Sequence, residues 1–308
     1  MINFRFHLIS LIAVFLSLGI GVVMGSTVID KAIVAGLENR IDTAEKNSID
    51  RKVENERLKN DIKSTDIQDT VLSAHVVKNS LANKTVYIVV AGAVSQDLIT
   101  ETRELLAVSG ATLGSEVFLK TDFLNSDKTK ISKDLNKVEN IAGILNEEKN
   151  VVSQTSISLN QLLSLRSSLE PASKTLSSDI NNVFTKYNAF TEQEQSSSLD
   201  AAMGVSFLVL VNRSELSNDN FIKFVSNFSS KSTSTIGLVG SDTDQPFRSK
   251  SISLLTNSAD QLCIVDNVES PSGRATLMLA HAGTISGLKN IYGISSKAKA
   301  PAPELSGS

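Results

Sequence analysis

Hydrophobic residues are most concentrated at the start of the chain, where residues 8–29 carry no formal charge. A helix of about 20 apolar residues crosses the ~30 Å hydrocarbon core of a bilayer, so the pattern predicts a transmembrane anchor within residues 1–30. A cleaved secretory signal is the alternative, with Arg5 as its positive region and Val23-Met24-Gly25 as its cleavage site. The apolar run exceeds the roughly 7–15 residues of such signals, which favours a retained anchor.

The charges around this segment predict its orientation. Arg5 and the free amino group precede the span, whereas Asp30 and Lys31 cancel each other after it. The positive-inside bias therefore places the N-terminus in the cytoplasm. We expect a single-pass protein of the cell membrane, with the bulk of the chain outside the cytoplasm and the lipid bilayer as a partner.

Small residues recur at every fourth position of the span. Small side chains at this spacing let two helix backbones approach closely. The pattern predicts that the anchor pairs with a second copy of the chain. The residues assigned to this interface are Ala13, Ser17, Gly21 and Gly25.

A heptad pattern follows within residues 31–80, the predicted coiled coil and linker. Asparagine at an a position, here Asn55, favours a parallel two-stranded coiled coil. A solvated single helix with charge pairs at i,i+4 is the alternative. Tethering by a paired anchor raises the effective concentration of the two helices, so we predict a homodimer. The seam residues assigned to the interface are Leu37, Ile41, Asn55, Leu58 and Ile62.

Strand and helix periods alternate from residue 81 onward, in the predicted domain 81–294. Near-continuous apolar strands separated by amphipathic helices are typical of a parallel sheet covered on both faces, so the fold class is α/β with a mostly parallel sheet. Expected strands are 84–90, 111–119, 204–211, 234–239 and 262–265; expected helices are 96–109, 218–228, 247–255 and 272–281.

Two segments do not follow this alternation. Residues near 127–202 are helical in pattern and rich in Ser, Asn and Lys, which predicts a helical insertion that ends in a loop at 193–198. Residues 295–308 combine Ser, Ala, Pro and Lys without an apolar run, which predicts a disordered tail.

Composition narrows the class of protein. The chain has 308 residues, 41% hydrophobic and 20% charged, which is typical of a globular protein. A net charge of −3 gives no reason to expect nucleic acid as a partner. The single cysteine, Cys263, excludes an intrachain disulfide, and its apolar neighbours predict a buried thiol.

Chemical motifs are absent from the sequence. There is no phosphate-binding glycine loop and no G-x-S-x-G motif, so we predict neither an enzyme nor a cofactor. Asp242 and Asp244 could hold a cation, although a polar turn is the commoner role. Soft metals need clustered sulfur and imidazole ligands, and here these residues are scattered. The best metal candidates are Cys263, Met278 and His281, for which packing roles are the alternative.

Two stretches resemble one known family. The first lies in residues 5–26 and the second in residues 265–293. They read Arg5-x-His7-x-x-Ser10-Leu11-x-Ala13-Val14-Phe15-Leu16-x-Leu18-x-x-Gly21-Val22-x-x-Gly25-Ser26 and Val265-Asp266-Asn267-Val268-x-x-Pro271-x-Gly273-Arg274, with Tyr292-Gly293 further on. This pattern resembles the actinobacterial MctB copper-transporter family.

Two functions remain open. The resemblance implies copper transport or efflux and copper homeostasis, with copper as the ligand and the outer membrane as a location. The hydrophobic pattern favours a non-catalytic dimeric scaffold that presents an α/β domain to a cell-wall or cell-division partner in the envelope.

Overall fold

The computed structural model describes residues 4–139, 141, 145, 149–166, 168, 170–194, 205–212, 219–230, 232–240, 245–258 and 262–304. The chain divides into two compact units, Met1–Thr65 and Asp66–Ser308. Each is described by itself.

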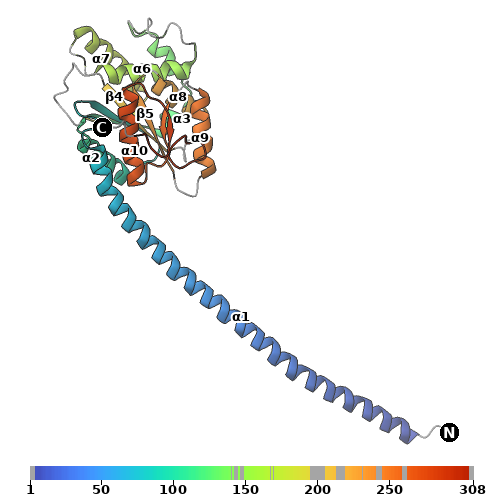
Figure 1. Cartoon of the computed structure of the whole chain (residues 1–308). Helices are drawn as coiled ribbons and strands as arrows, with labels where there is room; N and C mark the ends of the chain where they lie inside the picture. Colours follow the sequence, from blue (N-terminus) through green and yellow to red (C-terminus); the bar gives the residue numbers. More distant parts are fainter. Residues whose placement is uncertain are drawn as a thin grey trace. The chain divides into compact units, whose positions relative to one another are not determined.

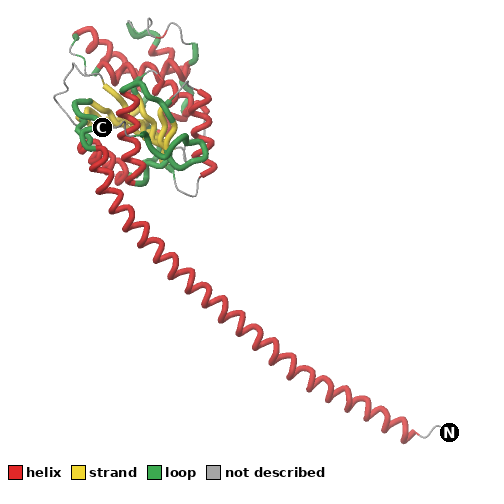
Figure 2. Tube along the Cα trace, in the orientation of Figure 1, coloured by secondary structure: helices red, strands yellow, loops and turns green. Residues whose placement is uncertain are grey.

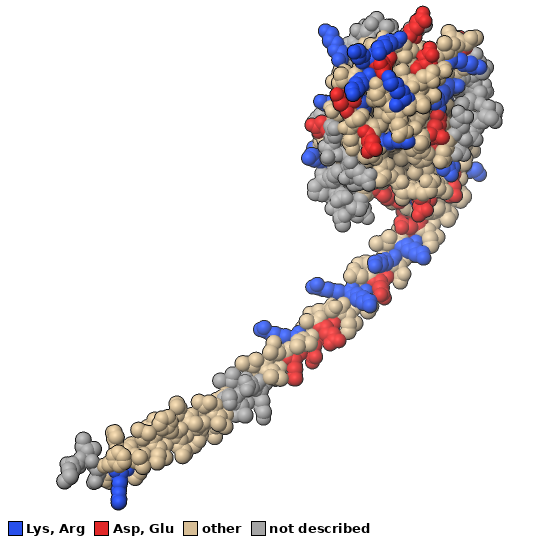
Figure 3. Space-filling view, turned by 180° about the vertical axis from the view of Figure 1, so that it is seen from behind, with Lys and Arg blue, Asp and Glu red and all other residues tan. Residues whose placement is uncertain are grey.

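The first unit consists of helix α1, Phe4–Val77, whose last turns belong to the second unit. Its apolar segment, Phe4–Gly25, has 22 residues and a mean hydropathy of 2.5, so its length and composition suit a membrane span. Figure 3 shows this segment as uncharged surface apart from one basic residue near its start, where the sequence has Arg5. The predicted anchor therefore begins a helix that continues without a break through the charged region.

The predicted coiled-coil segment is helical, but a coiled coil itself is not shown. Leu37, Ile41 and Ile62 are exposed on α1. Arg57 forms ion pairs with Glu54 (2.8 Å) and Asp61 (3.3 Å) within the same helix. These pairs at i,i+3 and i,i+4 are the contacts expected of a solvated helix, and the coiled coil stays a prediction.

The second unit is built on a seven-stranded sheet in the order β3-β2-β1-β4-β5-β6-β7. All neighbouring strands are parallel except β3, which pairs antiparallel with β2. The mostly parallel α/β fold is therefore confirmed. The strands are β1 (Thr85–Ala91), β2 (Thr112–Leu119), β3 (Phe190–Glu194), β4 (Val205–Asn212), β5 (Ser234–Val239), β6 (Cys263–Val265) and β7 (Ile291–Tyr292).

Helices cover both faces of the sheet, which explains why the central strands are apolar throughout (Figure 2). Every residue of β1 is buried. Alternate β1 side chains enter two hydrophobic clusters: Val86 and Ile88 pack with α2 (Gln96–Val108) and α10 (Pro271–Ile285), whereas Tyr87 and Val89 pack with α8 (Asp219–Ser230) and α9 (Gln245–Ser258). Figure 1 shows α10 and α9 on opposite sides of the strands.

The predicted insertion is helical, and it is continuous with the main core. Its elements are α3 (Thr121–Asn125), α4 (Thr129–Leu135), α6 (Val151–Leu165) and α7 (Pro171–Lys186). Leu159 and Phe184 of these helices belong to the same hydrophobic cluster as Phe228 of α8. The insertion therefore adds a further layer to one face of the sheet (Figure 1).

The prediction of a loop at residues 193–198 is wrong for its first two residues. Gln193 and Glu194 belong to β3, where they pair with Glu116 and Ser115 of β2. The sequence FTEQE has no apolar run because this strand forms the edge of the sheet, so the pattern did not reveal it. Residues 195–198 lie outside the described residues.

The prediction of a disordered tail is wrong for residues 295–304. The backbone N–H of Lys299 donates to Ile291 O at 2.8 Å, and Gly293 N–H donates to Ala300 O at 3.1 Å. Backbone hydrogen bonds hold this segment beside β7. Such bonds do not depend on the side chains, so the composition of the segment could not reveal that it is ordered. Residues 305–308 lie outside the described residues.

Candidate functional site

The order of the strands reverses between β1 and β4, where ligands commonly bind in parallel α/β sheets. A cleft of about 390 Å3 lies at the carboxyl ends of these strands. The Asn212 side chain donates from Nδ2 to Ala93 O at 2.5 Å across the strand ends. This strand-end cleft is lined by the polar side chains of Ser95, Asp97, Glu101, Asn212 and Glu269 and by the backbone of Gly240.

Carboxylates dominate the chemistry of the strand-end cleft. Glu269 accepts a hydrogen bond from Gly240 N–H, and Glu101 pairs with Arg274. Asp97 lies in the first turn of α2, where its carboxylate interacts favourably with the positive end of the helix dipole. Negative charge at this position opposes phosphate binding, so the cleft does not match a nucleotide site.

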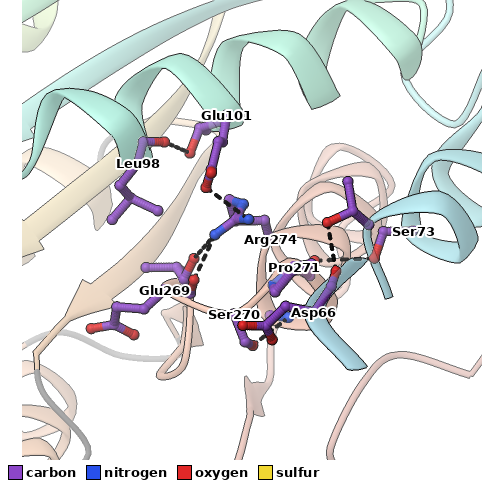
Figure 4. Close-up of polar contacts among 12 residues, drawn as sticks. Asp66, Ser73, Leu98, Glu101, Glu269, Ser270, Pro271 and Arg274 are labelled. Carbon is purple, nitrogen blue, oxygen red and sulfur yellow. Dashed lines mark hydrogen bonds and ion pairs between the residues drawn. The ribbon is translucent and has the colours of Figure 1, made fainter. Parts of the chain in front are cut away.

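A second cavity of about 300 Å3 shares Glu101 with the strand-end cleft. It lies between the last turns of α1, α2 and the start of α10 (Figure 4). We call it the junction cavity. Residues that line it are Thr70, Ser73, Ala74, Glu104, Leu105 and Arg274.

Arg274 is the central polar side chain of this region, and only 6% of it is exposed. Its NH1 group donates to Val268 O at 3.2 Å and to Glu269 O at 2.6 Å. Its NH2 group lies 2.8 Å from the Glu101 carboxylate. Burial lowers the pKa of Arg274, whereas nearby carboxylates, first that of Glu101, raise it. The guanidinium stays charged and fixes the loop before α10.

Two glycines allow the chain to close around the same loop, residues 266–270, which we call the β6–α10 loop. A Cβ at Gly273 would overlap the backbone carbonyl of Asn267, and one at Gly293 would overlap the Asp266 carboxylate. Gly293 also has φ +130°, a conformation that other residues rarely adopt. Gly273 and Gly293 of the family-like pattern therefore occupy positions where a larger residue would clash.

A protein-family model described as copper transport outer membrane protein, MctB, matches residues 1–303. The chain belongs to the MctB family. At the level of the family it is therefore a copper-transport-related envelope protein, and its apolar N-terminal helix agrees with membrane association. None of the curated proteins compared with the chain matches it.

Membership of the MctB family makes the three metal candidates important. Cys263 lies on β6, and Met278 and His281 lie on α10; all three are buried between the sheet and this helix. His281 uses both ring nitrogens: Nε2 lies 2.9 Å from Ser206 Oγ and Nδ1 lies 3.0 Å from Thr235 Oγ1. Burial lowers the pKa of His281 to about 3, so the ring is neutral at pH 7.

The thiol of Cys263 is also in a packing environment. Burial raises the pKa of Cys263, so the thiol rather than the metal-binding thiolate is present at neutral pH. Among the residues that the structure describes, no group of three or more His, Cys, Asp or Glu could hold a metal ion. A copper role for Cys263, Met278 and His281 stays a prediction, and Asp242 and Asp244 lie outside the described residues.

The predicted dimer residues of this MctB member all lie on α1. Ala13 and Ser17 are exposed, and an added Cβ at Gly21 or Gly25 would have no neighbour within 4 Å. Asn55 and Leu58 are likewise exposed. The structure contains one copy of the chain, so pairing through this face stays a prediction.

Sequence reasoning missed the proximity of Ser73, Glu101 and Arg274, which line the junction cavity together. These residues come from α1, α2 and α10, and their sequence separation hides their proximity. One signal was present: Arg274 begins an otherwise uncharged helix, where a buried arginine needs carbonyl or carboxylate partners.

Proposed function

We propose that this protein is a membrane-anchored, dimeric component of copper handling in the cell envelope. Residues 4–25 would anchor the chain as a single span, and the α/β unit would lie outside the cytoplasm. The observation that carries this proposal is the family match over residues 1–303, which includes the apolar helix at Phe4–Gly25.

The α/β unit would support copper transport by binding other components rather than by holding copper in its core. The hydrogen bonds of both His281 nitrogens support this assignment, because a metal ion would have to displace a hydroxyl from the ring. The raised pKa of Cys263 supports it as well.

Charges beside the heptad seam support a parallel dimer. With Ile41 at an a position, Arg40 falls at g and Glu45 at the e position five residues later. In a parallel coiled coil, Arg40 would face Glu45 of the second copy, and Glu54 would face Lys59. Asp61 and Asp66 would be an unfavourable pair. In the second unit, Leu72 and Val76 fall at d and a positions and are both exposed, whereas Asp69 occupies the a position between Ile62 and Val76.

The decisive experiment is deletion of the gene followed by complementation with the full chain. We expect deletion to raise cellular copper and copper sensitivity, and the wild-type chain to restore both. Cell separation is scored in the same strains. A deletion that leaves copper content and sensitivity unchanged would refute the proposal, and a separation defect alone would favour a scaffold for a cell-wall or cell-division partner.

A further inference from the structure

The β6–α10 loop and the first turn of α10 contact three parts of the chain that are distant in sequence. Pro271 and Arg274, at the start of α10, contact the end of α1 and the helix α2 (Figure 4). Asp266, at the start of the loop, binds the segment that follows β7. We propose that this loop is a latch: it couples the last turns of α1, residues 66–77, to the C-terminal segment, residues 293–300, so that the two open together. This inference goes beyond the proposed copper role.

Asp266 attaches the C-terminal segment to the loop. Its carboxylate is fully buried and accepts the backbone N–H groups of Ile294 at 2.8 Å and Ser295 at 2.9 Å. Hydrogen bonds to a charged acceptor are stronger than neutral ones, and a buried carboxylate without them is costly. Release of the C-terminal segment would therefore leave Asp266 unsatisfied and the loop without its main restraint at that end.

Ser73 attaches the end of α1 at the other side of the loop. Its buried hydroxyl donates to Pro271 O at 3.1 Å, only five positions after Asp266 in the sequence. Val77, one turn later, is fully buried in the same cluster as Val268 of the loop. The position of the loop therefore determines whether the last turns of α1 keep their contacts.

Arg274 makes the loop rigid between these attachments. It holds the carbonyl groups of Val268 and Glu269 and is itself fixed by Glu101 of α2. Segments that share one short restrained connection are expected to open as a single cooperative unit. A ligand that bound either segment would then change the opening of the other, because coupling is reciprocal.

Hydrogen–deuterium exchange on the full chain in detergent tests this latch, with strand β1 as the measure of global stability. The first variant is Asp266→Asn, which weakens the attachment of the C-terminal segment. We expect exchange to rise about threefold or more at residues 293–300 and also at residues 66–77, with β1 unchanged, as for loss of a modest hydrogen bond. A rise confined to residues 293–300 would overturn the proposal.

A matched pair of carboxylates on α2 tests the role of Arg274. Glu101→Gln removes the charge that pairs with Arg274, whereas Glu104→Gln removes a charge from the same cavity that has no ion pair in the described structure. We expect faster exchange at both segments for Glu101→Gln and at neither for Glu104→Gln. Equal profiles for these two variants would refute the coupling.

A milder variant covers the case in which Asp266→Asn does not fold. Ser73→Ala deletes only the hydroxyl that binds Pro271 O. We expect it to speed exchange at residues 293–300, which Ser73 does not contact in the described structure. An effect limited to residues 66–77 would overturn the proposal in the same way.

Discussion

At the residue scale, His281 shows how burial and hydrogen bonding fix one protonation state. The ring lies between the hydroxyl groups of Ser206 and Thr235, and burial lowers its pKa to about 3. The unfolded chain binds a proton near pH 6.5, whereas the folded chain does not until about pH 3. The contribution of His281 to stability is therefore fully present above pH 6.5 and falls as the pH decreases toward 3.

We predict that His281→Gln reduces the pH dependence of the unfolding free energy. In the wild type, each pH unit between 6.5 and 3 should remove up to about 1.4 kcal/mol through this group. The variant should be less stable at pH 7 because the network is disturbed, yet its stability should change less between pH 7 and pH 4.5. Urea unfolding at both pH values measures the difference, and His75→Gln, at an exposed position, is the control. Equal slopes for His281→Gln and the wild type would contradict the prediction.

A second prediction at this scale concerns copper. Tight Cu(I) binding needs several soft ligands that converge on the ion, and Cys263 and His281 are occupied by core contacts. We expect the full-length protein in detergent to show no stoichiometric Cu(I) binding against a chromogenic chelator.

Cys263→Ser and Met278→Leu should leave that titration unchanged. Stoichiometric binding that Cys263→Ser abolishes would instead assign copper to the core and would make direct transport the better function.

At the scale of elements, α1 combines an apolar segment, a charged segment and a docked end in one helix. The apolar positions Leu58, Ile62, Leu72 and Val76 are all exposed. They follow the spacing of a heptad seam, so a second copy would cover them.

We predict that Ile62→Asp weakens self-association by at least about tenfold, because it would replace an apolar pair at an a position by two carboxylates. Ile67→Asp is the matched control, since Ile67 is equally exposed but lies at an outer heptad position. Analytical ultracentrifugation in detergent measures both. If Ile67→Asp weakens association as much as Ile62→Asp, the heptad register is wrong.

Elements with a clear hydrophobic pattern could be predicted from the sequence. Elements that are held mainly by backbone hydrogen bonds to a neighbouring strand could not. β1 and β4 are almost entirely apolar because helices cover both faces of the sheet. β3 is polar and β7 has only two residues, so neither carries a period. The contact between Glu101 and Arg274 joins residues from two distant helices, and no local pattern encodes such proximity.

At the scale of the whole molecule, the small residues of the apolar segment bear on assembly. Gly21 and Gly25 leave the backbone of α1 open to a second helix. The pair lies within the segment that suits a membrane span.

We predict that Gly21→Ile combined with Gly25→Ile reduces pairing in a membrane two-hybrid assay, because the added side chains would separate the two backbones. Val22→Ile with Val23→Ile is the control on the same segment. If the glycine variant pairs as strongly as the wild type, dimerisation does not use these glycines. If the full-length wild type and a variant without residues 1–30 are both monomeric, the protein is not a dimer.

The register of the central strands has a consequence for biosynthesis. Thr85 of β1 pairs with Val205 of β4, so 120 positions separate the partners of the innermost strand pair. Synthesis proceeds from the N-terminus, and a parallel pair cannot form before its second strand has emerged. β1 therefore waits with its apolar edge uncovered while the whole helical insertion is made. We therefore expect such a nascent chain to need chaperones during that interval, and a stall before residue 205 to release an aggregation-prone fragment.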